Sequence, residues 1–222
     1  MVITIDGPTA SGKSSVAGAV ARVLGFYHLN SGLLYRSLAY LLVTVRGYSQ
    51  DDLFLVKQDD ILACMDSSLF LYTYQDGVIC VRYNGQEITQ FLKDSLVDYY
   101  VSLISSQALV RTAMVQKQHE LALMHDIVTD GRDVGSLVFP MAQHKFYLTA
   151  SLPVRAERWR KDQRARGHQF FLAEAESRIQ DRDMRDETRK ISPLIVPAGA
   201  VVIDSTELTF DQTVALVLSY IQ

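Results

Sequence analysis

Cysteine is scarce in this chain of 222 residues, which contains only Cys64 and Cys80. Two cysteines so far apart in the sequence cannot form the set of bridges that stabilises small secreted domains, so a reducing, cytoplasmic location is expected. Apolar runs of membrane-spanning length are also missing. Because the first predicted strand starts at Val2, no signal peptide is expected either.

An excess of charge of one sign is missing as well. The chain has 22 Lys and Arg against 25 Asp and Glu, a net charge of −3 and a pI near 5.9. This balance argues against a surface for nucleic acid or anionic membrane. The five histidines show no metal-binding spacing, so packed or solvated roles are expected for His119 and His125. With 48% hydrophobic residues, the chain can bury a core as one α/β domain or as two small domains.

The most informative motif is IDGPTASGKSSVAG at residues 5–18, where Gly7, Gly12, Lys13 and Ser14 have the spacing of a phosphate-binding loop. An apolar, β-branched stretch precedes it, and helical periodicity follows it over residues 14–24. Such a loop directs successive backbone N–H groups at an anion beside a helix N-terminus. Lys13 is expected to reach the β- and γ-phosphates, and the Ser14 hydroxyl to bind magnesium. The motif therefore predicts a nucleoside triphosphate site.

Alternating strand and helix patterns predict a parallel sheet covered by helices on both faces. Helices are predicted at residues 33–45, 52–64, 95–105, 108–125, 154–166, 173–190 and 210–221. Further core strands are predicted at residues 126–129, 145–150 and 201–203. β-rich runs at residues 68–74 and 78–83, with the turn signals Asp76-Gly77 and Asn84-Gly85, predict an inserted antiparallel meander at about residues 66–95.

Basic residues are concentrated near the C-terminus: eleven of the 22 Lys and Arg lie between Arg155 and Lys190. At 100° per residue, one helix face carries four arginines with Asp186 beside them: Arg178, Arg182, Arg185 and Arg189. This stripe favours an anion clamp, and Arg155 with Arg158 makes a second pair. The alternative is two solvated helices with i,i+4 ion pairs.

Asp130, after a predicted strand, suits a magnesium-bound water, or it caps the strand. Arginines spread over distant segments suit transfer between two phosphorylated substrates better than a switch or a motor.

Together these segments resemble the bacterial-type cytidylate kinases of the P-loop nucleoside monophosphate kinase superfamily. The blocks that carry the resemblance run in order from residue 2 to 206: ITIDGPTASGKSS, LNSGLLYR, SQALVR, DGRDVGSLVFP, FYLTASLPVRAER, RDMRDETRKISPL and VVIDST. The resemblance implies an α/β, three-layer P-loop kinase fold with a five-stranded parallel sheet. It places the antiparallel meander in a monophosphate-binding arm and adds a short helical lid. One domain is expected over residues 1–222, with the insert at about residues 66–105 and the lid at about 152–168.

The resemblance implies that the protein transfers the γ-phosphoryl group of ATP to CMP and also to dCMP, with Mg²⁺, as a cytoplasmic monomer in pyrimidine nucleotide metabolism. Nucleic acid and membrane are not expected as partners. The residues implied for ATP are Gly7, Pro8, Thr9, Ala10, Ser11, Gly12, Lys13, Ser14 and Ser15. Those implied for CMP are Ser31, Tyr35, Arg36, Ser102, Arg111, Arg132, Asp133, Arg182, Asp186 and Arg189. Catalysis is assigned to Lys13, Arg132, Arg155, Arg158 and Arg189, and magnesium to Ser14 and, through water, Asp130.

Three positions depart from the family pattern. Asn30 stands where an Asp is usual, so a metal-linked or capping role there loses its charge. Trp159 replaces a lid arginine, and Ala10 replaces a frequent loop glycine. Two alternatives to CMP kinase activity remain at this point: a nucleotide-binding regulator that does not transfer phosphate, and a kinase of another small acceptor such as UMP.

Overall fold

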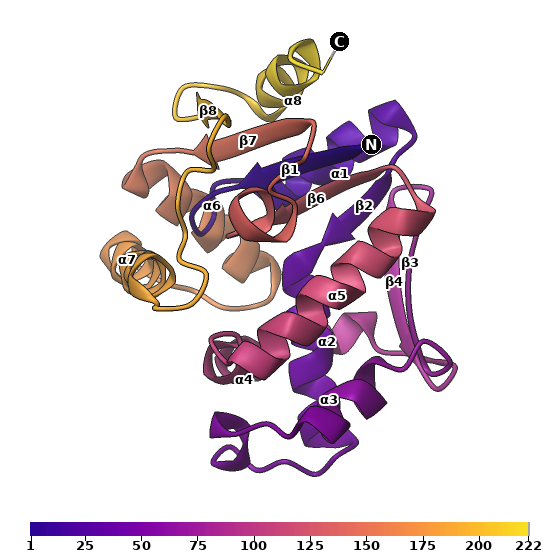
Figure 1. The fold of residues 1–222 in the computed structure, drawn as a ribbon. Coiled ribbons are helices and arrows are strands. Elements are labelled where there is room, and N and C mark those ends of the chain that lie inside the picture. The colour runs from indigo at the N-terminus through magenta and orange to yellow at the C-terminus, as the bar shows by residue number, and fades with distance from the viewer. Residues whose placement is uncertain (222) are drawn as a thin grey trace. The chain divides into compact units, whose positions relative to one another are not determined.

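The computed structural model describes residues 1–221 and divides the chain into two compact units (Figure 1). The terminal unit comprises Met1–Phe26 and Ile127–Gln222, and the central unit comprises Tyr27–Asp126. Among the described residues, no helix combines the length and apolar character that crossing a membrane requires.

The terminal unit alternates strands and helices as the sequence predicts. In chain order its elements are β1 (Val2–Asp6), α1 (Lys13–Leu24), β6 (Ile127–Gly131), the π-helical turn η3 (Val134–Val138), β7 (His144–Thr149), α6 (Leu152–Ala165), α7 (Leu172–Thr188), β8 (Val201–Asp204) and α8 (Phe210–Ser219).

The main sheet has five strands in the order β2-β6-β1-β7-β8, which confirms the predicted five-stranded parallel sheet. β1 runs parallel to both β6 and β7, and β7 runs parallel to β8. Ile3 and Ile5 of β1 are completely buried. In α1, Val20 is completely buried and Val16 is nearly so. Asp6, at the end of β1, lies opposite Gly131, at the end of β6. The loops after these two strands therefore leave the same edge of the sheet, where ligands bind in open α/β folds.

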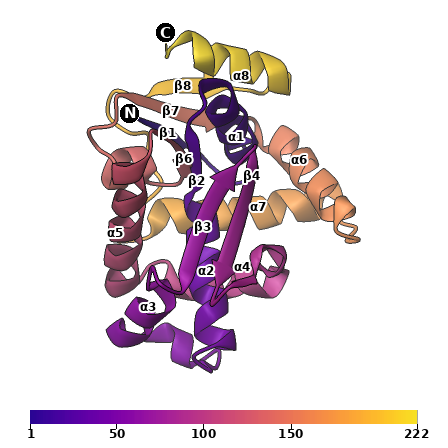
Figure 2. The same ribbon diagram turned by 90° about the vertical axis from the view of Figure 1, so that its right-hand side faces the viewer.

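The central unit contains the smaller sheet and most of the remaining helices. Its elements are β2 (Tyr27–Asn30), α2 (Ser31–Thr44), η1 (Asp52–Phe54), α3 (Gln58–Met65), β3 (Phe70–Gln75), β4 (Val78–Tyr83), β5 (Gln86–Glu87), η2 (Thr89–Lys93), α4 (Ser95–Ile104) and α5 (Ala108–Met124). β3, β4 and β5 form an antiparallel sheet, which confirms the predicted meander (Figure 2). Asp76 and Asn84, each before a glycine, adopt the left-handed conformation that such turns require.

One predicted helix, over residues 52–64, is divided in the structure. It ends after the short η1 and begins again at α3. Gln107 binds the backbone in between, because its Nε2 donates to the Leu53 carbonyl at 2.6 Å and its Oε1 accepts the Val56 N–H at 3.0 Å. A side chain about fifty positions away in the sequence therefore takes over hydrogen bonds that a continuous helix would have made internally.

Candidate nucleotide-binding site

The phosphate-binding loop joins β1 to α1, as the motif predicts. A Cβ on Gly7 would lie 2.1 Å from the Leu148 carbonyl oxygen, so only glycine fits there. Gly12 precedes α1 with φ 90° and ψ 1°, a left-handed conformation that favours glycine. Ala10 is also left-handed, with φ 58°, although it carries a Cβ. The loop therefore turns tightly into the N-terminus of α1.

Lys13 is folded against its own loop. Its Nζ donates to the Pro8 carbonyl at 2.9 Å, and the residue is only 7% exposed. Burial lowers the pKa of Lys13 well below its ordinary value, the positive charge of Arg132 adds to this shift, and Asp130 opposes it. An anion bound at the loop would favour the charged form, since an opposite charge favours ionisation.

Ser14 and Asp130 lie together at the same edge of the sheet. The Ser14 hydroxyl donates to Asp130 Oδ2 at 2.5 Å, and Asp130 is 2% exposed. Hydroxyl and carboxylate oxygens are the ligands that Mg²⁺ prefers. No group of three or more His, Cys, Asp or Glu side chains able to hold a metal occurs in the described part of the chain. The donors present fit a Mg²⁺ that takes its remaining ligands from phosphate and water.

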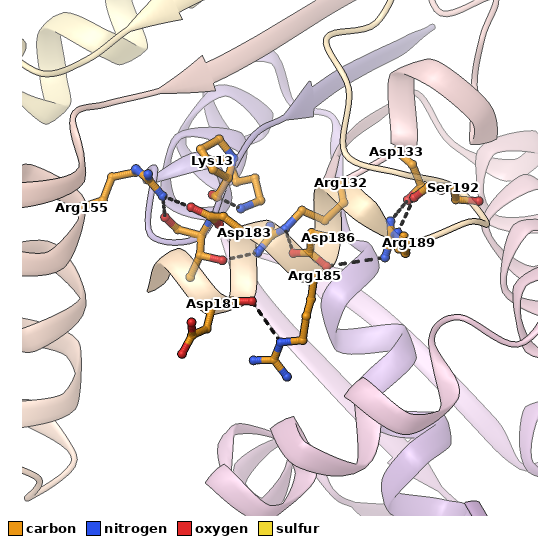
Figure 3. Close-up of polar contacts among 12 residues, drawn as sticks. Lys13, Arg132, Asp133, Arg155, Asp181, Asp183, Arg185, Asp186, Arg189 and Ser192 are labelled. Atoms are coloured by element: carbon orange, nitrogen blue, oxygen red, sulfur yellow. Dashed lines mark hydrogen bonds and ion pairs between the residues drawn. The ribbon is translucent and has the colours of Figure 1, made fainter. Parts of the chain in front are cut away.

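Arg132 and Asp186 form an ion pair beside the loop (Figure 3). Arg132 Nε donates to Asp186 Oδ2 at 2.7 Å, and its Nη2 donates to the Thr9 hydroxyl at 3.0 Å. Burial alone raises the pKa of Asp186, but the Arg132 charge and hydrogen bond outweigh it, so the pKa is lowered. Asp186 is therefore ionised and holds the guanidinium at the loop.

Arg189 extends this charged group. Its Nη1 lies 3.6 Å from Asp186 Oδ1 and its Nη2 lies 3.7 Å from Asp133 Oδ1, while its Nε donates to the Ser192 carbonyl (Figure 3). The structure thus brings four of the residues predicted for CMP together in the terminal unit, namely Arg132, Asp133, Asp186 and Arg189.

The predicted arginine stripe is divided. α7 ends at Thr188, and Arg189 follows it in an extended conformation. Arg178 pairs with Glu174 at 3.1 Å and lies over the Phe170 ring. Arg185 Nε donates to the Asp181 carbonyl, and its guanidinium points away from Arg132 (Figure 3). Arg182 contributes to the electric field of the site, since its charge helps to lower the pKa values of Lys13 and Asp186.

Both predicted lid arginines of α6 bind the backbone of the loop. Arg155 Nη1 donates to the Thr9 carbonyl at 3.0 Å, and Arg158 Nη1 donates to the Ser11 carbonyl at 3.2 Å. Arg158 is also bonded to Ser205, through the hydroxyl at 3.0 Å and the carbonyl at 2.9 Å. Four cationic side chains from three separate segments therefore surround residues 8–11: Lys13, Arg132, Arg155 and Arg158.

Two buried carboxylates at the site were not predicted from the sequence. Asp6 is fully buried and accepts the N–H groups of Val134 at 2.8 Å and Gly135 at 2.7 Å. Burial outweighs these hydrogen bonds and raises the pKa of Asp6 to about 7. Asp183 of α7 accepts the Thr9 N–H at 2.8 Å and pairs with Arg155. In the sequence, only the position of Asp6 directly before the loop could have indicated its role. Nothing distinguished Asp183 from the other charged residues of its polar helix.

Apart from Arg182 of α7, the remaining residues predicted for CMP belong to the central unit. Arg36 pairs with Asp98, with Nε and Nη2 at 3.0 and 2.5 Å from Asp98 Oδ1. Arg111 is 5% exposed and lies over the Tyr35 ring, 5.7 Å from its centroid. The remaining two are Ser31, a buried residue that begins α2, and Ser102, an exposed residue whose hydroxyl donates to the Tyr99 carbonyl.

Asn30 retains a capping function without the charge of an aspartate. Its side-chain oxygen accepts the Leu33 N–H at 2.8 Å at the start of α2. Neutral Asn caps a helix N-terminus about as well as Asp, so the substitution leaves the cap intact.

Comparison with known proteins agrees with this architecture. The model of the family described as cytidylate kinase matches residues 3–222. The cytidylate kinase of Chromobacterium violaceum is 39% identical over 221 residues, covering 100% of this chain and 95% of that protein. The cytidylate kinase of a Marinomonas species is 38% identical over 218 residues, covering 98% and 94%. A solved structure of an uncharacterised protein from Eubacterium ventriosum has a TM-score of 0.52 and 11% identity, covers 100% of this chain and 97% of its own, and supports the fold alone. The resemblance inferred from the sequence is confirmed, and this chain belongs to the cytidylate kinase family.

Proposed function

We propose that the protein transfers the γ-phosphoryl group of ATP to CMP, giving ADP and CDP, and that dCMP is a second acceptor. Family membership supports the choice of reaction. The observation that carries the proposal is the gathering of Lys13, Arg132, Arg155 and Arg158 around one phosphate-binding loop. A transition state between two phosphorylated substrates needs several such charges, whereas a nucleotide sensor needs few.

In this proposal the loop over residues 7–15 binds the ATP phosphates, with Lys13 on the β- and γ-phosphates. Thr9 contributes by fixing the shape of the loop and not by direct contact with phosphate, because its N–H, carbonyl and hydroxyl are all hydrogen-bonded to protein groups. Ser14 would hold Mg²⁺ directly and Asp130 would hold it through water. The ion, when bound, neutralises charge on the phosphates.

CMP is assigned to the residues that the family resemblance implies. Arg36, Arg132 and Arg189 bind its phosphate, and Arg182 with Asp186 binds its sugar. Ser102, Arg111 and Asp133 bind the cytosine, while Ser31 and Tyr35 contact the nucleotide. The segments proposed as monophosphate-binding insert and lid remain residues 66–105 and 152–168 of a single kinase domain.

The chemistry requires no nucleophile from the protein. An oxygen of the CMP phosphate attacks the γ-phosphorus in line, the new O–P bond forms, and the bond to the β–γ bridging oxygen breaks. Carboxylates hold the guanidinium groups before substrate arrives, Asp186 with Arg132 and Asp183 with Arg155. Charges positioned in advance stabilise the transition state without reorganising during the reaction.

The test is a coupled assay for ADP formation, with CDP identified directly, across CMP, dCMP, UMP and AMP. We expect CMP and dCMP to be used well, and UMP and AMP poorly. Nucleotide binding with no transfer to any acceptor would instead indicate a regulator. Faster transfer to UMP would identify UMP as the preferred acceptor.

Gel filtration of the same preparation tests the proposed monomer, and cell fractionation tests the proposed cytoplasmic location.

A further inference from the structure

Asp183 is a buried carboxylate of α7 that none of the steps above requires to touch a nucleotide. Its side chain is 10% exposed, and that of its partner Arg155 is 11% exposed. Oδ1 accepts the Thr9 N–H at 2.8 Å, and Oδ2 accepts a hydrogen bond from Arg155 Nη1 (Figure 3). One carboxylate therefore joins the phosphate-binding loop to a cationic side chain of α6.

The two partners of Asp183 are also bonded to each other. Arg155 Nη1 donates to the Thr9 carbonyl at 3.0 Å, and its Nε donates to the Ala150 carbonyl at 3.0 Å. Across residues 1–221, Arg155 Nη2 makes no hydrogen bond that could hold the guanidinium in another orientation. Nε and Nη1 thus each donate to protein acceptors, which leaves Nη2 to donate to a phosphate.

The Asp183–Arg155 pair differs from the Arg178–Glu174 pair of the same helix. Arg178 pairs with Glu174 on an exposed surface, where such pairs contribute little. Removing the anion from a buried pair leaves an uncompensated buried charge, which reorients toward solvent or other acceptors. The loss of Asp183 would therefore displace Arg155 and release the Thr9 N–H in one step.

We propose that Asp183 is a positioning residue for phosphoryl transfer, which holds the Arg155 guanidinium and the Thr9 backbone in the arrangement that the transition state needs. The inference rests on the proposed function, since Arg155 is taken to neutralise the transferring phosphoryl group. Asp183 acts through Arg155 and Thr9 and does not itself touch substrate.

The test is a double-mutant cycle on kcat with saturating ATP and CMP. Asp183→Asn keeps the shape and an oxygen that can accept the Thr9 N–H but removes the negative charge. We expect it to lower kcat about tenfold or more while the KM for CMP changes less than about twofold, because the lost contacts act on the transition state. When Arg155 is already Ala, the same substitution should change kcat less than about twofold, since residues acting as one unit are not additive.

Asp181→Asn is the matched control, because Asp181 lies on the same helix and is exposed; its kcat should equal that of wild type. If Asp183→Asn loses the native circular dichroism spectrum, Asp183→Glu takes its place in the same cycle, since it keeps the charge but shifts the carboxylate. Equal losses of kcat with and without Arg155, or a lowered Tm with unchanged kcat, would overturn the proposal. A wild-type enzyme that makes no CDP would overturn the proposed function instead.

Discussion

Lys13 shows most directly what a single residue contributes at this site. Its ammonium group is held by the Pro8 carbonyl within the loop, and the proposed contacts to CMP come from other residues. We expect Lys13→Met to lower kcat by a factor corresponding to about 3–4 kcal/mol, because a preorganised positive group is lost from the transition state. CMP affinity, measured by calorimetry, should stay within about twofold of wild type, since the residues proposed to bind CMP are unchanged in this variant. Lys57→Met, at an exposed position of the central unit, is the control. A parallel loss of CMP affinity and activity would show that Lys13 serves the acceptor.

Asp133 offers a second test at the residue scale, because it has a protein partner as well as a proposed role in base selection. Its Oδ1 lies 3.7 Å from Arg189 Nη2. Cytosine presents a donor at N4 and an acceptor at N3, and uracil reverses both. A carboxylate that accepts from N4 would face the O4 acceptor of UMP, a mismatch worth about 1–3 kcal/mol.

We therefore expect Asp133→Ala to lower kcat/KM for CMP about tenfold or more and to change that for UMP little, so that the CMP/UMP ratio narrows. The measurement is kcat/KM for both acceptors with wild type and variant. Equal losses for the two acceptors would mean that Asp133 only holds Arg189 and does not read the base.

At the scale of elements, α6 and α7 are joined by a small apolar cluster that includes the single tryptophan. Ala156, Ala175 and Ile179 are buried, and Trp159 packs against them and tilts over Phe170 with ring centroids 4.8 Å apart. A relative movement of the two helices would change the surroundings of the indole. We expect its emission to change when ATP and CMP, or a bisubstrate analogue, bind together, since lids close to exclude water. Trp159→Phe, which removes the signal, is the control. Unchanged emission at saturation would show that the two helices do not move relative to each other around Trp159.

Elements whose pattern is local were predictable from the sequence, and those that depend on distant partners were not. The loop, α1 and the β3–β4 hairpin carry their own glycine and turn signals, and they lie close to where the sequence predicts them. The strand β2 was missed because its four residues have little β-branching, and Tyr27 is held by aromatic neighbours such as His125, stacked at 4.3 Å. The division between η1 and α3 depends on Gln107, which no local pattern reveals.

The same limit applies to the site. Lys13, Ser14 and the arginines were found because their residue types and spacing indicate phosphate chemistry. Asp183 was missed because its role depends on the approach of α7 to the loop, and a helix with many acids gives no sign of which one is buried. Arg178 and Arg189 were grouped by an ideal helix period, but the helix ends before Arg189. Ion-pair partners depend on the tertiary structure and not on spacing alone.

At the scale of the whole molecule, Asp6 couples stability to pH. The carboxyl group is buried at the end of β1 and accepts the backbone N–H groups of Val134 and Gly135 in η3. Its pKa is raised from 3.8 to about 7. In the unfolded chain the group ionises near its ordinary value, so between pH 4 and 7 the folded state binds more protons. Stability from this group is therefore complete below about pH 4 and is lost as pH rises through about 7. The raised pKa corresponds to at most about 4 kcal/mol at 1.36 kcal/mol per pKa unit.

Asp6→Asn removes this titration and keeps a similar shape. We expect the free energy of unfolding of wild type, minus that of the variant, to fall by up to about 4 kcal/mol between pH 4 and pH 8 and to level off above that. The measurement is urea unfolding across that range, with the difference taken at each pH so that the other carboxylates cancel. Gly135→Ala should disturb the hydrogen bond between the Gly135 N–H and Asp6 while leaving the carboxyl group in place. The added Cβ would lie 2.9 Å from Asp6 Oδ2 and 2.6 Å from Thr4 Oγ1. A difference for Asp6→Asn that rises with pH would mean that the two backbone N–H groups outweigh burial, and that Asp6 is ionised throughout the range in which the enzyme works.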